Sequence, residues 1–368
     1  MRNFWQELPK PFFILAPMEA VTDVIFRHVV AEAGAPDVWF SEFTNATGWV
    51  HAGQKAIGGR LVKTDDEQPI VAQIWGGEPG DMEQLAMHCR ELGFHGIDIN
   101  MGCPAKSAVK SGGSALIRNP ELAAKAIAAA KTAGLPVSVK TRLGYTHVDE
   151  WRDWLAHLLR QDIVNLTIHL RTKKEMSKVA AHYELIDDIV KLRDEIAPHT
   201  LLTINGDVKN RTHGLELTTA HPGVNGVMIG RGIFHDPFAF TAPALGWHET
   251  GQHPDRGEAR ARGGSSDRTQ ETATNVARPE VESTMGARRS TTNRSKNVQK
   301  QHLIYLLHLH LDLFDHYHEQ MHRPFETLKR FFKVYVRDFD GAKELRDQLM
   351  HTKNTEEVRQ LLANHQSK

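Results

Sequence analysis

The sequence predicts an α/β protein in which an eight-stranded (β/α)8 TIM barrel is followed by a small C-terminal α-helical domain. From Phe12 to about Leu245, short apolar or β-branched runs alternate with longer amphipathic segments, as is typical of βα units that build a parallel sheet. Eight such units within roughly 250 residues match the size and order of this barrel. Beyond them the composition becomes polar, and apolar helical periodicity returns only at Gln301.

The strands are predicted from apolar runs bounded by turn residues, and the helices from amphipathic periodicity between them. The eight expected strands are Phe12–Ala16, Val38–Ser41, Ile70–Trp75, Gly96–Asn100, Val137–Lys140, Val164–His169, Leu201–Asn205 and Gly226–Gly230. The expected helices are Asp23–Ala33, Asp81–Leu92, Pro120–Ala133, Glu150–Arg160, Tyr183–Glu195 and Arg211–Ala220. Proline directly after Asn119 is typical of a first helical turn.

Composition divides the chain into three parts, of which residues 1–250 form the predicted barrel. Residues 251–300 hold few large apolar side chains, so they cannot bury enough surface to offset the entropy lost on ordering. We therefore predict a disordered, mildly basic linker there. Residues 301–368 regain apolar periodicity between Leu303 and Leu362, which predicts a domain of three or four helices.

Charge, cysteine content and hydropathy indicate which partners and which cellular compartment to expect. Lysine and arginine total 45, as do aspartate and glutamate, so net charge alone indicates no nucleic-acid partner. The two cysteines, Cys89 and Cys103, cannot form a disulfide framework, which favours a reducing compartment. The N-terminus lacks a signal pattern, and no apolar run approaches the roughly 18 residues of a membrane span. We expect a cytoplasmic monomer without a membrane anchor or a stable protein partner.

A ring of polar and glycine residues follows the predicted strands at their carboxyl ends, where barrels of this kind build active sites. Any one of these residues could be a hydrogen-bonded structural group, but a bare scaffold has no need of the whole ring. Its members are Pro17, Met18, Gln73, Asn100, Lys140, His169, Asn205, Gly206, Asp207, Gly230 and Arg231. The glycines after the last two strands would let backbone N–H groups approach a phosphate, to which Arg231 could add a charge-assisted contact.

This ring suits a mononucleotide cofactor that carries a flat polar ring system. Lys140 and Gln73 are suitable donors for the carbonyl oxygens and N1 region of a flavin, where positive charge favours the reduced anion. No G-x-G-x-x-G fingerprint opens a βαβ unit, so a tightly held NAD is not indicated.

Cys103 lies just beyond the predicted strand Gly96–Asn100, in the segment Asn100-Met101-Gly102-Cys103-Pro104. Free cysteine is often a small buried filler, and Cys89, within an amphipathic helical stretch, fits that interpretation. Cys103 instead falls in a loop where an active site is expected. A thiol with an unperturbed pKa of about 8.5 is mostly protonated at neutral pH, so it could donate a proton beside the cofactor.

A set of motifs spans the predicted barrel in order. They are Ala16-Pro17-Met18-Glu19-Ala20-Val21-Thr22-Asp23, Asn100-Met101-Gly102-Cys103-Pro104, Lys110-Ser111-Gly112-Gly113-Ser114, Val139-Lys140-Thr141-Arg142-Leu143-Gly144, His169-Leu170-Arg171-Thr172, Asn205-Gly206-Asp207 and Met228-Ile229-Gly230-Arg231-Gly232. These motifs closely resemble those of the tRNA-dihydrouridine synthases, although many family members have glycine at the position of Leu170. The resemblance implies an FMN-dependent enzyme that reduces the C5–C6 double bond of particular uridines in tRNA, with NADPH or NADH as the reductant.

The resemblance also implies roles for single residues. Cys103 would donate the proton to C5 of uridine while reduced flavin gives hydride to C6. FMN would be held by Pro17, Met18, Gln73, Lys140, His169, Asn205, Gly206, Asp207, Gly230 and Arg231, and the substrate would be contacted by Asn100 and Arg171. Four basic residues of the helical domain recur at helical spacing and are expected to form one face. This face would contact tRNA phosphates through Lys329, Arg330, Lys333 and Arg337. A short basic stripe by itself is more often a solvated face.

Three alternatives compete with this function. His318-Glu319-Gln320-Met321-His322 is a literal H-E-x-x-H zinc motif, but short patterns arise by chance in a chain with 22 histidines, and we assign no metal. An FMN-dependent barrel oxidoreductase of a small molecule, similar to dihydroorotate dehydrogenase, would leave the basic helical face without a purpose. A non-catalytic RNA-binding module would leave the ring at the strand ends unexplained.

Overall fold

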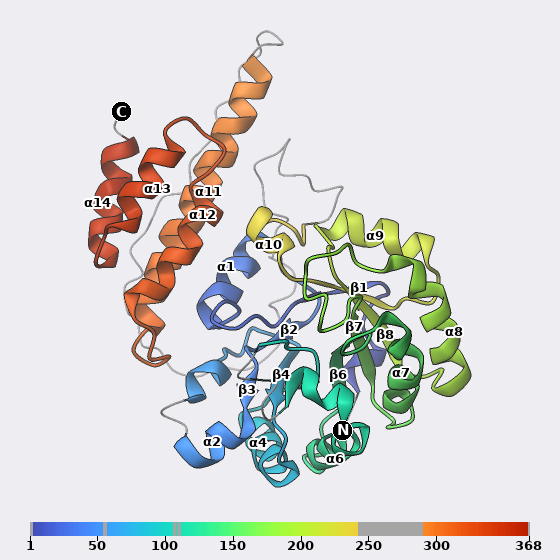
Figure 1. Cartoon of the computed structure of the whole chain (residues 1–368). Coiled ribbons are helices and arrows are strands. Elements are labelled where there is room, and N and C mark those ends of the chain that lie inside the picture. The colour runs from blue at the N-terminus through green and yellow to red at the C-terminus, as the bar shows by residue number, and fades with distance from the viewer. Residues whose placement is uncertain (1–2, 54–56, 106–107, 109–111, 242–289, 367–368) are drawn as a thin grey trace, which may run out of the picture.

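The computed structural model describes residues 3–53, 57–105, 108, 112–241 and 290–366, which form a parallel barrel beside a group of helices (Figure 1). The strands are ordered β1-β9-β8-β7-β6-β5-β4-β2, and each of these pairings is parallel. A bridge between Ile14 and Val38 joins the two ends of this order. The sheet therefore closes, and the predicted (β/α)8 barrel is confirmed.

The strands agree closely with the predicted runs, because glycine and proline mark their ends. They are β1 Phe12–Leu15, β2 Trp39–Phe40, β3 Thr44–Asn45, β4 Ile70–Trp75, β5 Gly96–Asn100, β6 Val137–Arg142, β7 Asn165–His169, β8 Leu201–Asn205 and β9 Gly226–Ile229. The strand β3, which pairs with β4, was not predicted because two residues are too few to show alternation.

Six barrel helices lie near their predicted positions, and the short α2 and α10 were not predicted. The barrel helices are α1 Val24–Gly34, α2 Ala46–Ala52, α4 Pro79–Glu91, α6 Pro120–Lys131, α7 Trp151–Leu159, α8 Ile186–Ile196, α9 Arg211–Ala220 and α10 Gly232–His235. Asp23 and Asn119 accept backbone N–H groups at the starts of α1 and α6, as N-cap residues do.

Alternation along β1 separates the two apolar faces of the barrel wall. Phe12 and Ile14 belong to a small apolar cluster, whereas Phe13 and Leu15 join the larger core that packs against the helices. The small cluster contains Trp5, whose ring lies 5.6 Å from that of Phe12. The N-terminal segment therefore covers the end of the barrel where the strands begin, and the opposite end is left for a site.

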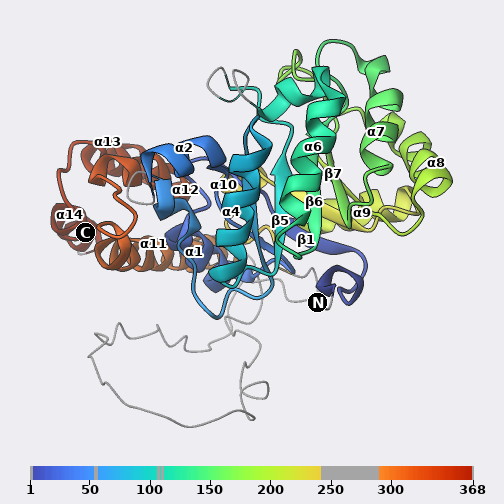
Figure 2. The same ribbon diagram turned by 90° about the horizontal axis from the view of Figure 1, so that it is seen from below.

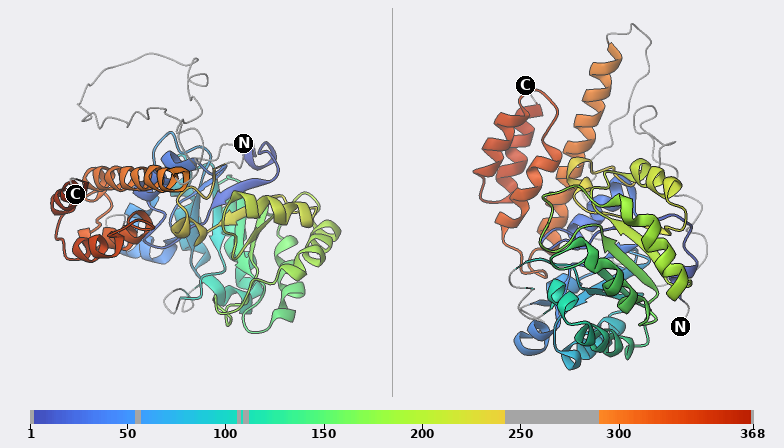
Figure 3. Two further views of the ribbon diagram at one scale, coloured as in Figure 1. Left: turned by 90° about the horizontal axis from the view of Figure 1, so that it is seen from above. Right: turned by 45° about the vertical axis from the view of Figure 1, so that its right-hand side comes forward.

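The C-terminal helices pack on one side of the barrel. They are α11 Ser290–Tyr317, α12 Phe332–Tyr335, α13 Ala342–Met350 and α14 Thr355–Gln366, with a 3-10 helix at Phe325–Phe331. Figures 2 and 3 show these helices next to α1 and α2 and far from α7 and α8. None of the helices in the described ranges is long and apolar enough to cross a membrane.

The predicted linker at 251–300 requires one correction. Residues 251–289 lie outside the described residues, but α11 begins at Ser290, so residues 290–300 are helical rather than disordered. These residues are polar and show no apolar stripe, which is why the sequence did not reveal them. Extending an existing helix costs much less than starting one, so the packed turns that contain Leu303 and Leu307 account for the extension.

Candidate active site at the strand ends

The predicted polar ring is assembled at one end of the barrel. In the parallel register, Asn100 is paired with Lys140, and His169 is paired with both Arg142 and Asn205. Four neighbouring strands, β5 to β8, thus carry polar side chains to the same opening. The fold places together the residues that the sequence predicted there, which is the geometry expected of an active site in this kind of barrel.

A buried hydrogen-bonded network links β4, β5 and β6. Gln73 Nε2 donates to Asp98 Oδ2 at 2.6 Å, and Ser138 Oγ donates to Asp98 Oδ1 at 2.6 Å. Asn100 Nδ2 donates to Gln73 Oε1 at 3.0 Å. Burial raises the pKa of Asp98 to about 6, although these two donors and the charge of Lys140 oppose the rise. Asp98 therefore fixes the orientation of the Gln73 amide, and Gln73 fixes that of Asn100.

Asn100 also sets the position of Cys103. Its Oδ1 accepts the backbone N–H groups of Gly102 at 3.0 Å and Cys103 at 2.9 Å. The Cys103 carbonyl in turn accepts the backbone N–H of Ser114 at 3.1 Å. Burial raises the pKa of the Cys103 thiol, with smaller opposing effects from the Ala105 N–H and nearby cations. The thiol is therefore protonated at neutral pH and can donate a proton.

Two cations lie two residues apart on β6, and the structure uses them differently. Burial and, to a lesser extent, the charge of Arg142 lower the pKa of Lys140 to about 8, while Asp98 opposes the shift. Within the described residues, no hydrogen bond or ion pair holds the Lys140 ammonium. Arg142 Nε instead donates to Gly102 O at 2.7 Å, and its Nη1 donates to Thr172 O at 3.1 Å. Lys140 is thus available to a ligand, whereas Arg142 ties the Cys103 loop to the loop after β7.

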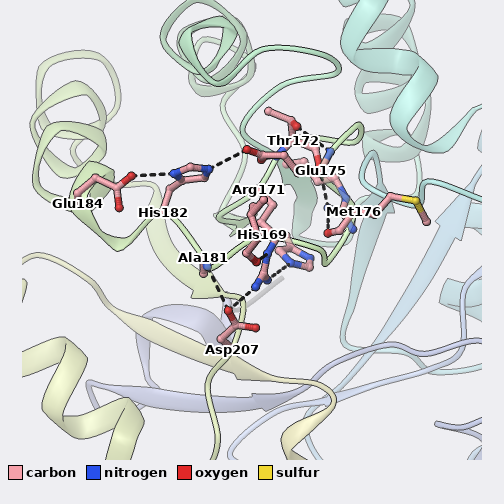
Figure 4. A network of polar contacts seen from close by, with 11 residues as sticks. His169, Arg171, Thr172, Glu175, Met176, Ala181, His182, Glu184 and Asp207 are labelled. Carbon is pink, nitrogen blue, oxygen red and sulfur yellow. Dashed lines mark hydrogen bonds and ion pairs between the residues drawn. The ribbon is translucent and has the colours of Figure 1, made fainter.

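A second polar cluster surrounds His169 at the ends of β7 and β8 (Figure 4). Arg171 Nη1 donates to His169 Nε2 at 3.1 Å, and Arg171 Nη2 donates to Asp207 Oδ2. The Nε of Arg171 donates to Val179 O at 2.7 Å. Burial, together with the surrounding cations, holds the pKa of His169 well below its ordinary value. His169 is therefore neutral, with Nε2 as a hydrogen-bond acceptor.

The placement of Arg171 does not suit the substrate contact that the sequence predicted. Its side chain is only 2% exposed, and its guanidinium is occupied by the three partners just named. It holds the loop after β7 rather than facing solvent. Arg231 differs, since its side chain is 59% exposed and, among the described residues, bonds only through Nη2, to Asp207 Oδ1 at 3.2 Å.

Glycines in the loops after β8 and β9 bring backbone close to these side chains. Gly206 has φ +123°, in the region that favours glycine, and a Cβ there would lie 3.2 Å from Ala181. A Cβ built on Gly230 would have only Ala16 and Met18 within 4 Å among the described atoms, at 3.5 and 3.9 Å. The space beside the Gly230 backbone is therefore open. Accessible glycine backbone, an exposed guanidinium and a free ammonium are the donors that a phosphate-bearing flavin requires.

A family model described as dihydrouridine synthase (Dus) matches residues 14–278. The chain belongs to the dihydrouridine synthase family. It is 52% identical over 362 residues to a Bacillus subtilis (strain 168) protein named "Probable tRNA-dihydrouridine synthase 2", which covers 98% of this chain and 95% of that protein. Proteins named "Probable tRNA-dihydrouridine synthase" from Staphylococcus epidermidis and Staphylococcus aureus (strain COL) are each 50% identical over 362 residues, covering 98% of this chain and 95% and 94% of those proteins.

In this member of the dihydrouridine synthase family, the four basic residues expected to contact tRNA do not form one stripe. They lie on a 3-10 helix, the short α12 and the segment after it, so the spacing of a single α-helix does not apply. Lys329 pairs with Glu326 at 3.5 Å and Arg337 Nη1 donates to Phe234 O at 3.2 Å, and both side chains are largely covered. Arg330 and Lys333 are exposed.

The H-E-x-x-H sequence does not form the helical face that a zinc site of this type needs. The helix α11 ends at Tyr317, and His322 has φ +52°. His318 Nδ1 lies 3.1 Å from Phe314 O. In the part of the chain that the structure describes, no three histidine, cysteine or carboxylate side chains cluster as a metal site would.

Two residues of the site, Asp98 and Arg142, were missed by the sequence analysis. Asp98 precedes Asn100 by two residues, and Arg142 follows Lys140 by two. Since side chains in a strand alternate between faces, each lies on the same face as the neighbour that was predicted. This alternation was the signal that could have revealed them.

Proposed function

We propose that this protein is a tRNA-dihydrouridine synthase that uses FMN to reduce the C5–C6 double bond of uridine in tRNA to 5,6-dihydrouridine, with NADPH or NADH as the reductant. The observation that carries the proposal is the protonated Cys103 thiol, positioned by Asn100 at the mouth of a barrel that also presents the free ammonium of Lys140. The names of the relatives support tRNA as the substrate. A tRNA substrate in turn favours the cytoplasm as the location.

The donors around the barrel mouth fit a flavin mononucleotide. The backbone N–H groups of Gly206, Asp207 and Gly230 and the Arg231 guanidinium would hold the phosphate, and Gln73 and Lys140 would contact the ring system. The remaining members of the ring would complete the site, namely Pro17, Met18, His169 and Asn205. When bound, the reduced flavin supplies the hydride for C6 of uridine, and NADPH or NADH restores it.

The residues of the chain supply the proton and the orientation. Asn100 holds the Cys103 backbone, so the thiol stays in one place, and Cys103 donates its proton to C5 as a general acid. Arg142 restrains both loops that border the uracil, because it bonds Gly102 O and Thr172 O. The buried network through Asp98 keeps the Asn100 amide oriented.

Flavin analysis of the purified protein tests the proposal directly. We expect a yellow protein that releases about one equivalent of FMN on denaturation, and that converts uridine to dihydrouridine in tRNA lacking this modification when NADPH or NADH is present. Mapping dihydrouridine in a strain without the gene would identify the position. A protein that neither retains nor rebinds FMN, or that leaves unmodified tRNA unchanged, would refute the proposal.

A further inference from the structure

Two arginines of the C-terminal helical domain support the loop between β1 and α1: Arg330 contacts it directly, and Arg323 acts through Glu42, which lies between β2 and β3. Arg323 Nη2 donates to both carboxylate oxygens of Glu42, at 2.8 and 2.6 Å. The Oε1 of Glu42 also accepts the backbone N–H of Ala20. Arg330 Nη1 donates to the Ala20 carbonyl at 3.0 Å. Both backbone polar groups of Ala20 are therefore held by contacts that involve the helical domain.

Ala20 needs this support because its backbone is strained. Its φ is +54°, in the left-handed region that is unfavourable for a residue with a Cβ. The same turn includes Met18, whose carbonyl accepts the N–H groups of Val21 and Thr22, each at 3.1 Å. Met18 N–H donates to Thr22 Oγ1 at 2.8 Å. The conformation of Ala20 is thus coupled to that of Met18, which borders the open space before Gly230.

The pair that supports Ala20 is itself buried. The Glu42 side chain is fully buried and that of Arg323 is 15% exposed. Removing one partner of a buried ion pair leaves an uncompensated charge, which is strongly unfavourable. Burial raises the pKa of Glu42, and the nearby negative charge of Asp23 raises it too. Arg323 acts in the opposite direction and favours the charged carboxylate. The loop therefore depends on Arg323 being in place.

We propose that Arg323 and Glu42 are positioning residues, through which docking of the helical domain holds the β1–α1 loop and Met18 in the conformation that the flavin site requires. The effect on flavin binding rests on the proposed function, whereas the restraint on the loop exists without the flavin. The domain expected to contact tRNA would then also shape the cofactor site. Weaker docking of that domain would lower flavin affinity without any change in the residues that touch the flavin.

Hydrogen exchange of the full-length protein without flavin tests the restraint. We expect Arg323→Met to accelerate exchange of the Ala20 amide about tenfold, a change in the range of couplings between contacting groups. Arg359→Met is the matched control, because Arg359 bridges Asp312 and Asp315 within the helical domain at 2.7 and 2.8 Å. The control should leave the Ala20 amide protected. Equal protection of this amide in the wild type and in Arg323→Met would overturn the inference.

Flavin binding separates a positioning role from a purely structural one. Arg323→Met should weaken FMN binding about tenfold, and Ala20→Gly in that background should recover part of the loss, because glycine adopts positive φ readily. Glu42→Gln keeps an acceptor for the Ala20 N–H but loses the charged pair, so it should show a smaller effect and serves if Arg323→Met misfolds. Unchanged FMN affinity in both variants would refute the link to the cofactor. A wild-type protein that binds no FMN would instead refute the proposed function, while the exchange experiment would still decide the restraint.

Discussion

Asn100 shows how a single side chain connects Gln73, a proposed cofactor contact, to the loop of Cys103, the proposed proton donor. Its Nδ2 donates to Gln73, and its Oδ1 accepts two backbone N–H groups of the Cys103 loop. An aspartate there would lose the donor, and a leucine would lose all three bonds. The position therefore requires an amide, which explains why an asparagine stands directly before a loop that bears a thiol.

The proposed acid is tested by Cys103→Ala. The proposed function places the thiol toward the substrate and not the flavin, so we expect the variant to retain FMN and to oxidise NADPH. It should lose uridine reduction by about 10²–10⁴-fold, the usual contribution of a general acid. Cys89→Ala is the control, since Cys89 is buried within α4 and its pKa is raised by burial alone. Wild-type rates of dihydrouridine formation in Cys103→Ala would exclude the role.

Asp98 predicts a specific dependence of stability on pH. Its folded-state pKa of about 6 lies above the value of about 3.9 in an unfolded chain, so the folded protein binds more protons between these values. The free energy of unfolding should therefore fall as the pH rises from about 4 to about 6. Asp98→Asn should remove this component, on the order of 3 kcal/mol. Denaturant unfolding at several pH values checks it, with the exposed Asp149→Asn as control. Parallel pH profiles for wild type and Asp98→Asn would contradict the assignment.

At the scale of elements, strand alternation and turn residues located the barrel but not the contacts between its parts. The strands β4, β5 and β8 have the predicted bounds because apolar runs end at glycine, proline or polar residues. The bond from Arg142 to Thr172 and the pair formed by Glu42 and Arg323 join residues far apart in sequence. No local pattern encodes such pairs, so they had to come from the structure.

The basic residues near α12 differ in their expected contribution to tRNA binding. Lys333 is exposed, whereas Arg337 is largely covered and bonded to Phe234 O. Lys333→Gln should therefore reduce the salt slope of tRNA binding by about one unit, the amount expected for one lost phosphate contact. Arg337→Gln should lower the melting temperature more than it changes that slope. Titrations at several salt concentrations would contradict this division if Arg337→Gln alone reduced the slope.

At the scale of the whole molecule, the barrel and the helical domain share a buried aromatic interface. The ring of Phe331 lies 5.0 Å from that of Phe26 in α1 and 4.7 Å from that of His310 in α11. His310 Nδ1 lies 2.7 Å from the Tyr335 hydroxyl, and burial lowers the pKa of His310 to about 3. Because these rings are buried, separate movement of the two domains is unfavourable, since opening the interface would expose apolar rings to water.

This interface predicts that the two domains unfold together. Phe331→Ala should destabilise the protein by about 3–5 kcal/mol, the usual cost of removing a buried aromatic ring, and FMN release should shift to lower temperature with it. Phe339→Ala is the control, because Phe339 is only partly buried and its ring faces that of His365 within the helical domain, at 5.8 Å with a tilt of 44°. Calorimetry and flavin fluorescence recorded on the same samples should give one shared transition in the wild type. Loss of helical signal well before FMN release would show that the domains are independent, and the helical domain could then not hold the β1–α1 loop as we infer.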